Sequence, residues 1–473
     1  MKTVSPLRRR YFRFSNRISL RVKQGIFAYA AKFRVSREIT ENFMRSVPLW
    51  IASACVGGVA VLYASLFARA EAAGLNLVAK KPWLIFFLAP ASFIAAWYCV
   101  HRFAPMARGS GIPQISAALE ISGTNAQSGV ERLLGLRVLV LKILSSCLLV
   151  FGGGAVGREG PTIQISGALF RFMDRITPSH WPMYSEKVLL LTGGAAGLAA
   201  AFNTPLGGIV FAIEELSKLH FSSFRTTLLT GVIISGFAAQ MLLGPYLYLG
   251  YPRVAGNSLS LIWFVVLTAV FSGLAGAALS RLILGFLMIM RRLDSDIKKM
   301  IVAGMLGLAM ACLAYFFSPT VLGSGKEIMV SLLFTGDTPS EYTMPMRFFG
   351  PLLSFISGGA GGIFAPALAG GASLGAVIAG AAGISPEQTN VLILTGMVGF
   401  LTGITRSPFT SAILVLEMTD RHSVIFYLML ASLIGMASAW FVSREPFYES
   451  LKKMYLGEVL DASLAKQKKS GRA

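Results

Sequence analysis

The sequence predicts an all-α polytopic membrane protein, and the reasons are its composition and its apolar runs. The chain has 473 residues, of which 54% are hydrophobic and only 14% are charged, a much smaller charged fraction than soluble proteins carry. Apolar runs recur along nearly the whole chain, and several are long enough to cross a bilayer as helices. Others are short and broken by Gly or Pro, which is typical of helices that stop within the membrane.

Nine apolar runs are the clearest candidates for membrane helices. The 49 Gly residues of the chain fit close packing between such helices. The runs are Val47–Phe67, Trp83–Val100, Leu134–Phe151, Val188–Phe202, Thr226–Leu243, Leu261–Met290, Ile301–Phe317, Val391–Thr402 and Val424–Val442.

The chain is strongly basic, with a formal net charge of +21. Nucleic-acid binding is one explanation of such a value, but the position of the charge argues against it. Residues 1–46 hold twelve Lys or Arg against two Glu, and a basic segment before the first span indicates a cytoplasmic N-terminus next to anionic lipid. Within it, residues 20–36 have the pattern of an amphipathic surface helix. Basic residues also interrupt any apolar core of a cleavable signal peptide.

The sequence contains no recognisable constellation for catalysis or metal binding. The Cys residues stand singly in apolar runs, and the His residues are scattered at loops or segment ends. There is no Walker loop, dinucleotide fingerprint or nucleophile elbow. We therefore expect no metal site, no cofactor and no enzymatic activity. The residues concerned are Cys55, Cys99, Cys147, Cys312, His101, His180, His220 and His422.

A Gly-x-x-x-Pro pattern occurs three times at the edges of apolar segments, and each copy predicts the broken start of a helix. Gly permits a sharp turn and close backbone approach, and Pro suits the first helical turn. The free N–H groups of such a start attract an anion, and irregular backbone in a membrane must be buried or line a cavity. Three copies therefore predict an anion path, formed by Gly109, Gly111, Pro113, Gly157, Arg158, Gly160, Pro161, Gly362 and Pro366.

The chain also contains an internal duplication. Leu191–Gly193, Pro205 and Glu214 recur 203 residues later as Leu394–Gly396, Pro408 and Glu417, and Pro161 recurs 205 residues later as Pro366. Duplicated halves suggest a transporter with its site at the repeat interface; the sequence leaves open whether the repeats are parallel or inverted. The predicted parts are a basic N-terminal segment 1–46, membrane repeats 47–250 and 251–442, and a C-terminal segment 443–473.

The duplication sorts the acidic residues into two classes. Glu214 has a counterpart in Glu417, which favours a role in the fold, for example at a helix end. Glu215 and Glu159 have Met418 and Phe364 at the matching positions. Acids present in one half alone are better candidates for directional chemistry.

These motifs together resemble the signature of the CLC family of chloride channels and proton-coupled chloride transporters. The resemblance rests on GSGIP at 109–113, GREGP at 157–161, GGIFAP at 361–366, AFNTPLGGIVFAIEE at 201–215, EMT at 417–419 and Tyr448, and it covers roughly residues 47–450. It implies the CLC fold of two inverted-repeat halves with broken and tilted helices. It also implies a homodimer with one pathway in each subunit.

The resemblance places an anion site residue by residue. Ser110 and Tyr448 would each donate a hydroxyl to a central chloride, and the backbone N–H groups of Ile363 and Phe364 would complete the site. No Lys or Arg need touch the ion, and partial charges hold an anion loosely enough for it to leave. Ser at position 110 is similar to the chloride-selective members.

The resemblance also gives roles to the two unpaired acids. Glu159 resembles the gating glutamate, which blocks the path when deprotonated and swings out when protonated; the alternative is a structural pair with Arg158. Glu215 resembles the inner proton-transfer glutamate of the antiporters; the alternative is a solvated helix end. Both acids favour a secondary active transporter that exchanges chloride for protons. The runner-up is a passive voltage- or pH-gated chloride channel, and a scaffold leaves the anion-type motifs unexplained.

Some residues depart from the family pattern. Gln114 and Ser116 stand where relatives carry acids, which leaves Arg158 without a familiar partner, and Ala360 replaces a common Pro. Only 25 residues follow Tyr448, so we expect no nucleotide-sensing domain. The expected location is a bacterial inner (plasma) membrane, with both termini in the cytoplasm.

Overall fold

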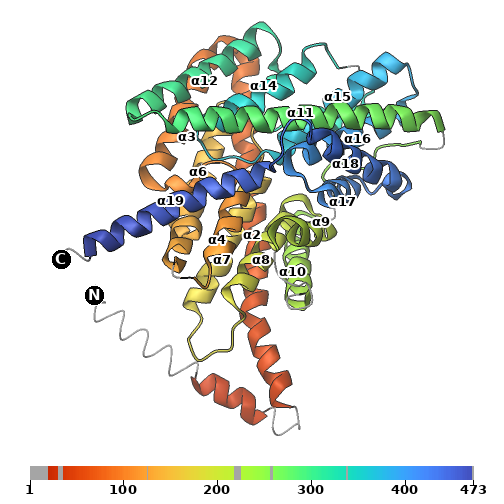
Figure 1. Ribbon diagram of the computed structural model, residues 1–473. Coiled ribbons are helices and arrows are strands. Elements are labelled where there is room, and N and C mark those ends of the chain that lie inside the picture. Colours follow the sequence, from red (N-terminus) through yellow and green to blue (C-terminus); the bar gives the residue numbers. More distant parts are fainter. Residues whose placement is uncertain are drawn as a thin grey trace.

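The protein is a bundle of helices that differ widely in length and tilt (Figure 1). Its computed structural model describes residues 20–29, 36–124, 126–217, 225–244, 246–255, 259–336 and 339–470. Within these ranges every regular element is a helix, apart from two isolated β-bridges. Nine helical segments of the same ranges are long and apolar enough to cross a membrane. The predicted fold class, an all-α polytopic membrane protein, is confirmed.

The first half of the chain contains helices of very unequal length. They are α2 (Arg37–Lys80), η1 (Pro82–Leu84), α3 (Ile85–Phe103), η2 (Pro105–Ala107), α4 (Ile112–Ile121), η3 (Gln127–Gly129), α5 (Val130–Leu134), α6 (Leu136–Phe151), α7 (Glu159–Ile176), α8 (Glu186–Phe202), α9 (Pro205–Phe211), η4 (Ala212–Leu216) and α10 (Arg225–Leu243).

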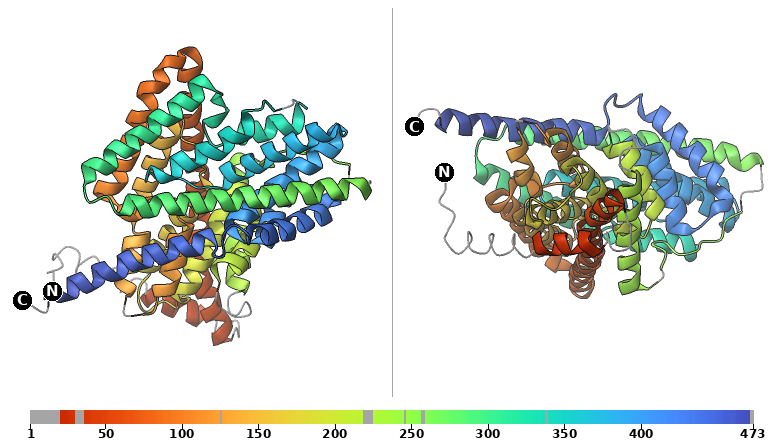
Figure 2. Two further views of the ribbon diagram at one scale, coloured as in Figure 1. Left: turned by 45° about the horizontal axis from the view of Figure 1, so that its top comes forward. Right: turned by 90° about the horizontal axis from the view of Figure 1, so that it is seen from below.

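The second half repeats this mixture. Its elements are α11 (Leu259–Arg291), α12 (Asp296–Phe316), η6 (Pro319–Val321), α13 (Lys326–Phe334), α14 (Thr343–Ile356), α15 (Phe364–Ala382), α16 (Pro386–Thr405), α17 (Pro408–Thr419), η7 (His422–Val424), α18 (Ile425–Ala439) and α19 (Phe447–Ser470). The long helices α11 and α19 lie across the bundle in both figures (Figures 1 and 2) and pack against each other.

The boundaries of some predicted spans are wrong, each for a local reason. The run Val47–Phe67 is only the middle of α2, which has 44 residues and continues through polar residues at both ends. The run Leu134–Phe151 is divided at Gly135, where the backbone is extended and α6 begins. The predicted amphipathic helix at 20–36 is helical over 20–29, and residues 1–19 and 30–35 lie outside the described ranges.

The helices α15 and α16 form the most enclosed part of the bundle. Both are apolar on all sides, which is expected of a helix that is surrounded by others, and nearly all their residues are buried. Gly371 of α15 faces Gly396 of α16 so closely that a Cβ on Gly371 would lie 2.2 Å from the Gly396 carbonyl oxygen. Small residues therefore let these two backbones touch, and this holds the start of α15 in place.

Two carboxylates each cap the start of a helix in the opposite half of the chain. Glu214 of η4 accepts hydrogen bonds from the N–H groups of Phe409 (3.2 Å) and Thr410 (2.7 Å) at the start of α17. Glu417 of α17 accepts them from Leu206 (3.0 Å) and Gly207 (2.6 Å) at the start of α9. The prediction that Glu214 serves a helix end is confirmed. The contact is reciprocal, as expected of segments related by a two-fold axis.

We expect Glu214→Ala and Glu417→Ala each to destabilise the protein by about 1–3 kcal/mol, because each leaves partly buried N–H groups without an acceptor. The measurement is the thermal unfolding temperature of the detergent-solubilised protein. Glu38→Ala is the matched control, since Glu38 is a carboxylate at a helix start that is exposed. Unfolding temperatures equal to that of the control would show that the caps contribute nothing.

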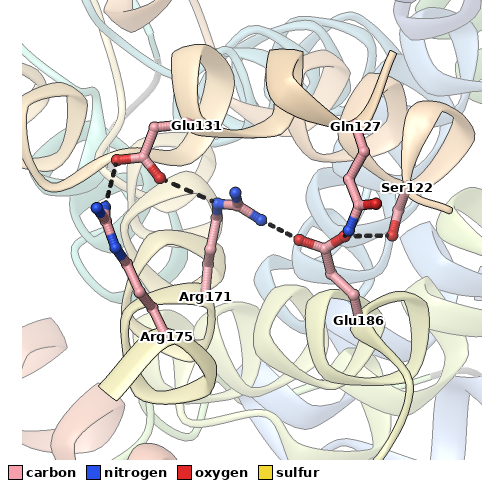
Figure 3. Close-up of polar contacts among 6 residues, drawn as sticks. All are labelled: Ser122, Gln127, Glu131, Arg171, Arg175 and Glu186. Carbon is pink, nitrogen blue, oxygen red and sulfur yellow. Dashed lines mark hydrogen bonds and ion pairs between the residues drawn. The ribbon is translucent and has the colours of Figure 1, made fainter. Parts of the chain in front are cut away.

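An ion-pair network ties α5, α7 and α8 together at one end of the bundle (Figure 3). Arg171 of α7 lies between Glu131 (3.4 Å) and Glu186, and Arg175 also pairs with Glu131 (3.2 Å). Ser122 and Gln127 donate hydrogen bonds of 2.7 and 3.0 Å to Glu186. Because several charges share the network, it orients the end of α7 whose other end forms the functional site.

Candidate anion and proton site

The three Gly-x-x-x-Pro motifs begin three helices, as predicted, and they meet. Gly111 precedes α4, Arg158 precedes α7 and Ile363 precedes α15. Backbone hydrogen bonds join the segments in pairs. Gly109 donates to the carbonyl oxygen of Gly359 and accepts from the N–H of Gly361. Gly157 and Gly362 bond to each other in both directions (2.8 and 2.7 Å). Pro113, Pro161 and Pro366 all fall in the first turn of their helices. Three segments that are separated by about 50 and about 200 residues in the sequence thus form one structural unit.

The close approach in this unit depends on Gly160. Its position faces Ser110 so closely that a Cβ there would lie 2.2 Å from the Ser110 Oγ and 2.9 Å from the Ser110 carbonyl oxygen. Any side chain at position 160 would therefore occupy the space beside the hydroxyl. The Gly in the middle of this motif keeps the site open.

Ser110 and Tyr448 are buried hydroxyls that lie next to each other. Among the described residues, neither has a hydrogen-bond partner of regular geometry. Phe364 packs beside Tyr448 with ring centroids 6.1 Å apart, and the N–H groups of Ile363 and Phe364 lie at the free start of α15. Buried donors are normally satisfied, so this cluster is suited to an acceptor from outside the chain, and a small anion fits that description.

A buried cation lies behind the Ser110 loop. Lys142 of α6 is fully buried, and its ammonium group donates hydrogen bonds to the carbonyl oxygens of Ala107 (2.9 Å) and Gly109 (2.7 Å). It fixes the loop next to Ser110. This residue was not identified from the sequence, because a single Lys in an apolar run does not by itself indicate a functional role.

Glu159 is the first residue of α7 and is 1% exposed. One carboxylate oxygen, Oε1, accepts a hydrogen bond from the Tyr248 hydroxyl (3.2 Å). The other, Oε2, is buried without a hydrogen-bond partner among the described residues, and it lies over Gly157, where a Cβ would approach it to 2.2 Å. Among the described residues, only one of its two oxygens is therefore held by a side-chain donor. No ion pair joins Arg158 to another described residue, but its charge acts on Glu159 through space and favours the carboxylate.

Glu215 lies in η4, is half-buried, and borders the same gap as Tyr448. Its carboxylate accepts a hydrogen bond from the Ser407 hydroxyl (2.6 Å). A gap lined by Glu215, Ser407, Phe364 and Tyr448 is too narrow for a water molecule. The carboxylate is therefore enclosed on this side, and the alternative of a solvated helix end stays a prediction for its other side.

A cavity of about 200 Å³ opens beside Glu215. Ser116 and Lys452 are among the residues that line it, together with Glu120 and Glu449. Lys452 pairs with Glu120 (3.0 Å) and with Glu449 (2.7 Å). Glu215 thus faces a polar cavity on one side and a dry gap on the other, which is the placement expected of a proton carrier between water and the protein interior.

The residues that depart from the family pattern have structural roles here. The amide of Gln114 is buried and donates to the carbonyl oxygens of Met106 (3.2 Å) and Arg108 (2.7 Å), which fixes the chain just before the GSGIP motif. Ser116 bonds to its own helix (3.2 Å), and the carboxylate that α4 presents to the cavity is that of Glu120, one turn further along. The N–H of Ala360 donates to Ser145 (3.0 Å), a bond that Pro at this position excludes.

The comparisons with known proteins agree with this arrangement. A family model described as voltage gated chloride channel matches residues 91–439. The H(+)/Cl(−) exchange transporter ClcA of Cronobacter sakazakii is 32% identical over 414 residues, which cover 83% of this chain and 84% of the relative. Among solved structures, a slow cyanobacterial Cl−/H+ antiporter has a TM-score of 0.74 and 24% identity, covering 88% of this chain and 98% of the other.

Two further solved structures share the fold. A eukaryotic CLC transporter has a TM-score of 0.71 and 19% identity, over 87% of this chain and 75% of the other. A CLC-type fluoride/proton antiporter has a TM-score of 0.71 and 20% identity, over 88% of this chain and 99% of the other. Because the family model spans most of the chain and the curated relative exceeds 30% identity, the chain belongs to the CLC family of voltage-gated chloride channels and their transporter relatives.

Proposed function

We propose that the protein is a secondary active transporter that exchanges chloride for protons across a membrane. The observation that carries this proposal is that both carboxylates adjoin the hydroxyl cluster: Glu159 begins the helix whose Gly160 packs on Ser110, and Glu215 borders the same gap as Tyr448. A passive channel needs the hydroxyl site but not a second carboxylate beside a polar cavity. The exchange activity in the names of ClcA and of the cyanobacterial antiporter supports the same choice.

The chemistry assigned to each residue is simple. Ser110, Tyr448 and the N–H groups of Ile363 and Phe364 supply partial positive charge to chloride, strong enough to replace water and weak enough to release the ion. Glu159 blocks the anion path when it is deprotonated, and it leaves the path when it is protonated. Glu215 takes a proton from the cavity and passes it inward. One carboxylate, Glu159, thereby serves both ions.

The test is made on purified protein in liposomes. A chloride gradient is imposed, the voltage is clamped with valinomycin and potassium, and the external pH is recorded. We expect protons to move against their own gradient, driven by chloride. Chloride flux at constant pH would instead establish a passive channel, and no chloride flux would reject both functions.

We also propose that the protein works as a homodimer whose contact surface includes α9 and α17. These helices are too short to cross a membrane, yet the capping carboxylates Glu214 and Glu417 are only partly buried, and Leu206 and Phe409 beside them are 55% and 54% exposed. Half-exposed charge is costly against lipid, so a second copy is a suitable cover. The test is the mass of the detergent-solubilised protein, which should equal two chains.

The remaining proposals concern orientation and internal symmetry. We propose that repeats 47–250 and 251–442 form one pathway per subunit, and the reciprocal Glu214 and Glu417 caps support two related halves. We propose a bacterial inner membrane with both termini in the cytoplasm, for which the basic residues 1–46 are the support. Thiol labelling of a Cys introduced near either terminus, from each side of the membrane, tests the orientation.

A further inference from the structure

Tyr248 is placed against Glu159 by a segment that belongs to neither helix of the gate. It follows α10 in the stretch 246–255, is 3% exposed, and donates its hydroxyl hydrogen to the Glu159 Oε1 at 3.2 Å. Among the described residues, no other side chain donates a hydrogen bond to this carboxylate. The phenol is thus the main side-chain donor to the group assigned as the gate.

The segment that carries Tyr248 is fixed on both sides. The Asn203 amide donates to the Tyr246 carbonyl oxygen (2.7 Å), and the N–H of Leu249 donates to the Met418 carbonyl oxygen (3.1 Å). Phe202 meets the Tyr248 ring edge-on, with centroids 5.0 Å apart. These contacts come from both halves of the chain, so the position of the hydroxyl is set by the folded repeat interface.

A cation lies on the face of the same ring. The ammonium group of Lys326, the first residue of α13, is 4.6 Å from the centroid of Tyr248. A cation over an aromatic ring is held by the electron density of the ring, and it withdraws charge from the phenol. Withdrawal of charge makes the hydroxyl a better donor, and a carboxylate is the acceptor that benefits most.

Other charged and titratable groups surround Glu159, and they act on it through space. Arg158 and Lys326 favour the carboxylate form, and Glu71 opposes it. The neutral phenols of Tyr63, Tyr246 and Tyr448 have little effect on the charge state of Glu159. The full set is Arg158 before α7, Glu71 and Tyr63 of α2, Tyr246 of the same segment, Lys326 of α13 and Tyr448 of α19.

We propose that Tyr248 is a positioning residue that holds the deprotonated Glu159 through its hydroxyl and thereby sets the pH at which the gate opens. The phenol keeps its proton throughout, and the proton that opens the gate binds to Glu159 alone. A neutral carboxyl gains less from the donor than a carboxylate does, so protonation loosens the bond. This inference rests on the gating role of Glu159 in the proposed function.

The experiment is chloride flux from liposomes as a function of pH, for the wild type and for Tyr248→Phe. Flux should rise as the pH falls, because protonation frees the path. Without the hydroxyl, the carboxylate loses a donor and protonates at higher pH. We expect the midpoint of the profile to move up by about one pH unit, a tenfold change in the protonation equilibrium, and flux at neutral pH to increase. An unmoved midpoint would overturn the proposal.

The matched control is Tyr63→Phe. Tyr63 is equally buried and lies near the gate, but its hydroxyl bonds to Ser146 (2.7 Å), so its removal should leave the midpoint in place. A shift of equal size in this control would reduce the effect of Tyr248 to general packing. If Tyr248→Phe does not fold, a ring-fluorinated tyrosine at position 248 keeps the shape and strengthens the donor, and it should move the midpoint to lower pH.

Failure of this inference is distinguishable from failure of the proposed function. Proton movement driven by chloride in both proteins, with identical pH profiles, rejects the role of Tyr248 and leaves exchange intact. Chloride flux without proton movement rejects exchange, but a shifted profile in Tyr248→Phe still supports the role of Tyr248. A wild-type profile that does not depend on pH rejects a protonation gate and the role of Tyr248 with it.

Discussion

In liposomes under a chloride gradient, Glu159→Gln should carry chloride while the external pH stays constant. Gln has nearly the shape of Glu, so the neighbouring Ser110 and Tyr448 site should remain formed. The amide binds no proton in the working pH range, and Glu159 is the carboxylate that Tyr248 contacts. Proton movement should therefore fall to the leak of empty liposomes. The pH dependence of chloride flux should disappear as well, because the gate is then permanently uncharged.

Glu71→Gln is the matched control for this variant. Glu71 is another largely enclosed carboxylate of the membrane region, and it accepts a hydrogen bond from the N–H of Ser324 (2.5 Å). Gln keeps an acceptor for that bond, so Glu71→Gln should still exchange chloride for protons. Persistent proton movement in Glu159→Gln would contradict the shared gate. Loss of coupling in both variants would indicate that any change of charge in this region is damaging.

The parts of the site that depend on local backbone chemistry could be predicted from the sequence. Gly and Pro at fixed spacing specify a helix start wherever they occur, so the three motifs located the starts of α4, α7 and α15. The offset of 203 residues correctly separated Glu214, which caps a helix, from Glu215, which bonds to Ser407. In both cases the signal is in the sequence itself and needs no knowledge of how the helices pack.

The parts that depend on long-range packing could not be predicted. Tyr248 meets Glu159 across 89 residues, and neither its loop nor its composition distinguishes it from Tyr246. Lys142 contacts the Ser110 loop with the end of its long side chain. A hydropathy pattern indicates only that a basic residue interrupts the apolar run. The sequence did contain a signal for Ser407, which the sequence analysis missed. Ser407 directly precedes Pro408 at a helix start that the duplication marks, just as Thr204 precedes Pro205.

Glu215→Gln should stop proton movement and spare chloride flux, for a reason that differs from that of Glu159→Gln. Glu215 borders the polar cavity and accepts a hydrogen bond from Ser407, and the gap between it and Tyr448 is too narrow for a water molecule. Neutralising it removes the relay that carries protons from the cavity, and it leaves the anion site unchanged. Proton movement that continues in this variant would show that the proton path assigned here is wrong.

The two variants can be told apart by the pH dependence that each retains. In Glu215→Gln the gate still titrates from the opposite side, so chloride flux should keep its rise toward low external pH, whereas Glu159→Gln should lose it. The control is Glu120→Gln, which changes a carboxylate of the same cavity that pairs with Lys452 rather than with Ser407. Since Glu449 still pairs with Lys452, this variant should keep coupled exchange. Equal loss of coupling in Glu120→Gln would assign proton transfer to the cavity as a whole instead of to Glu215.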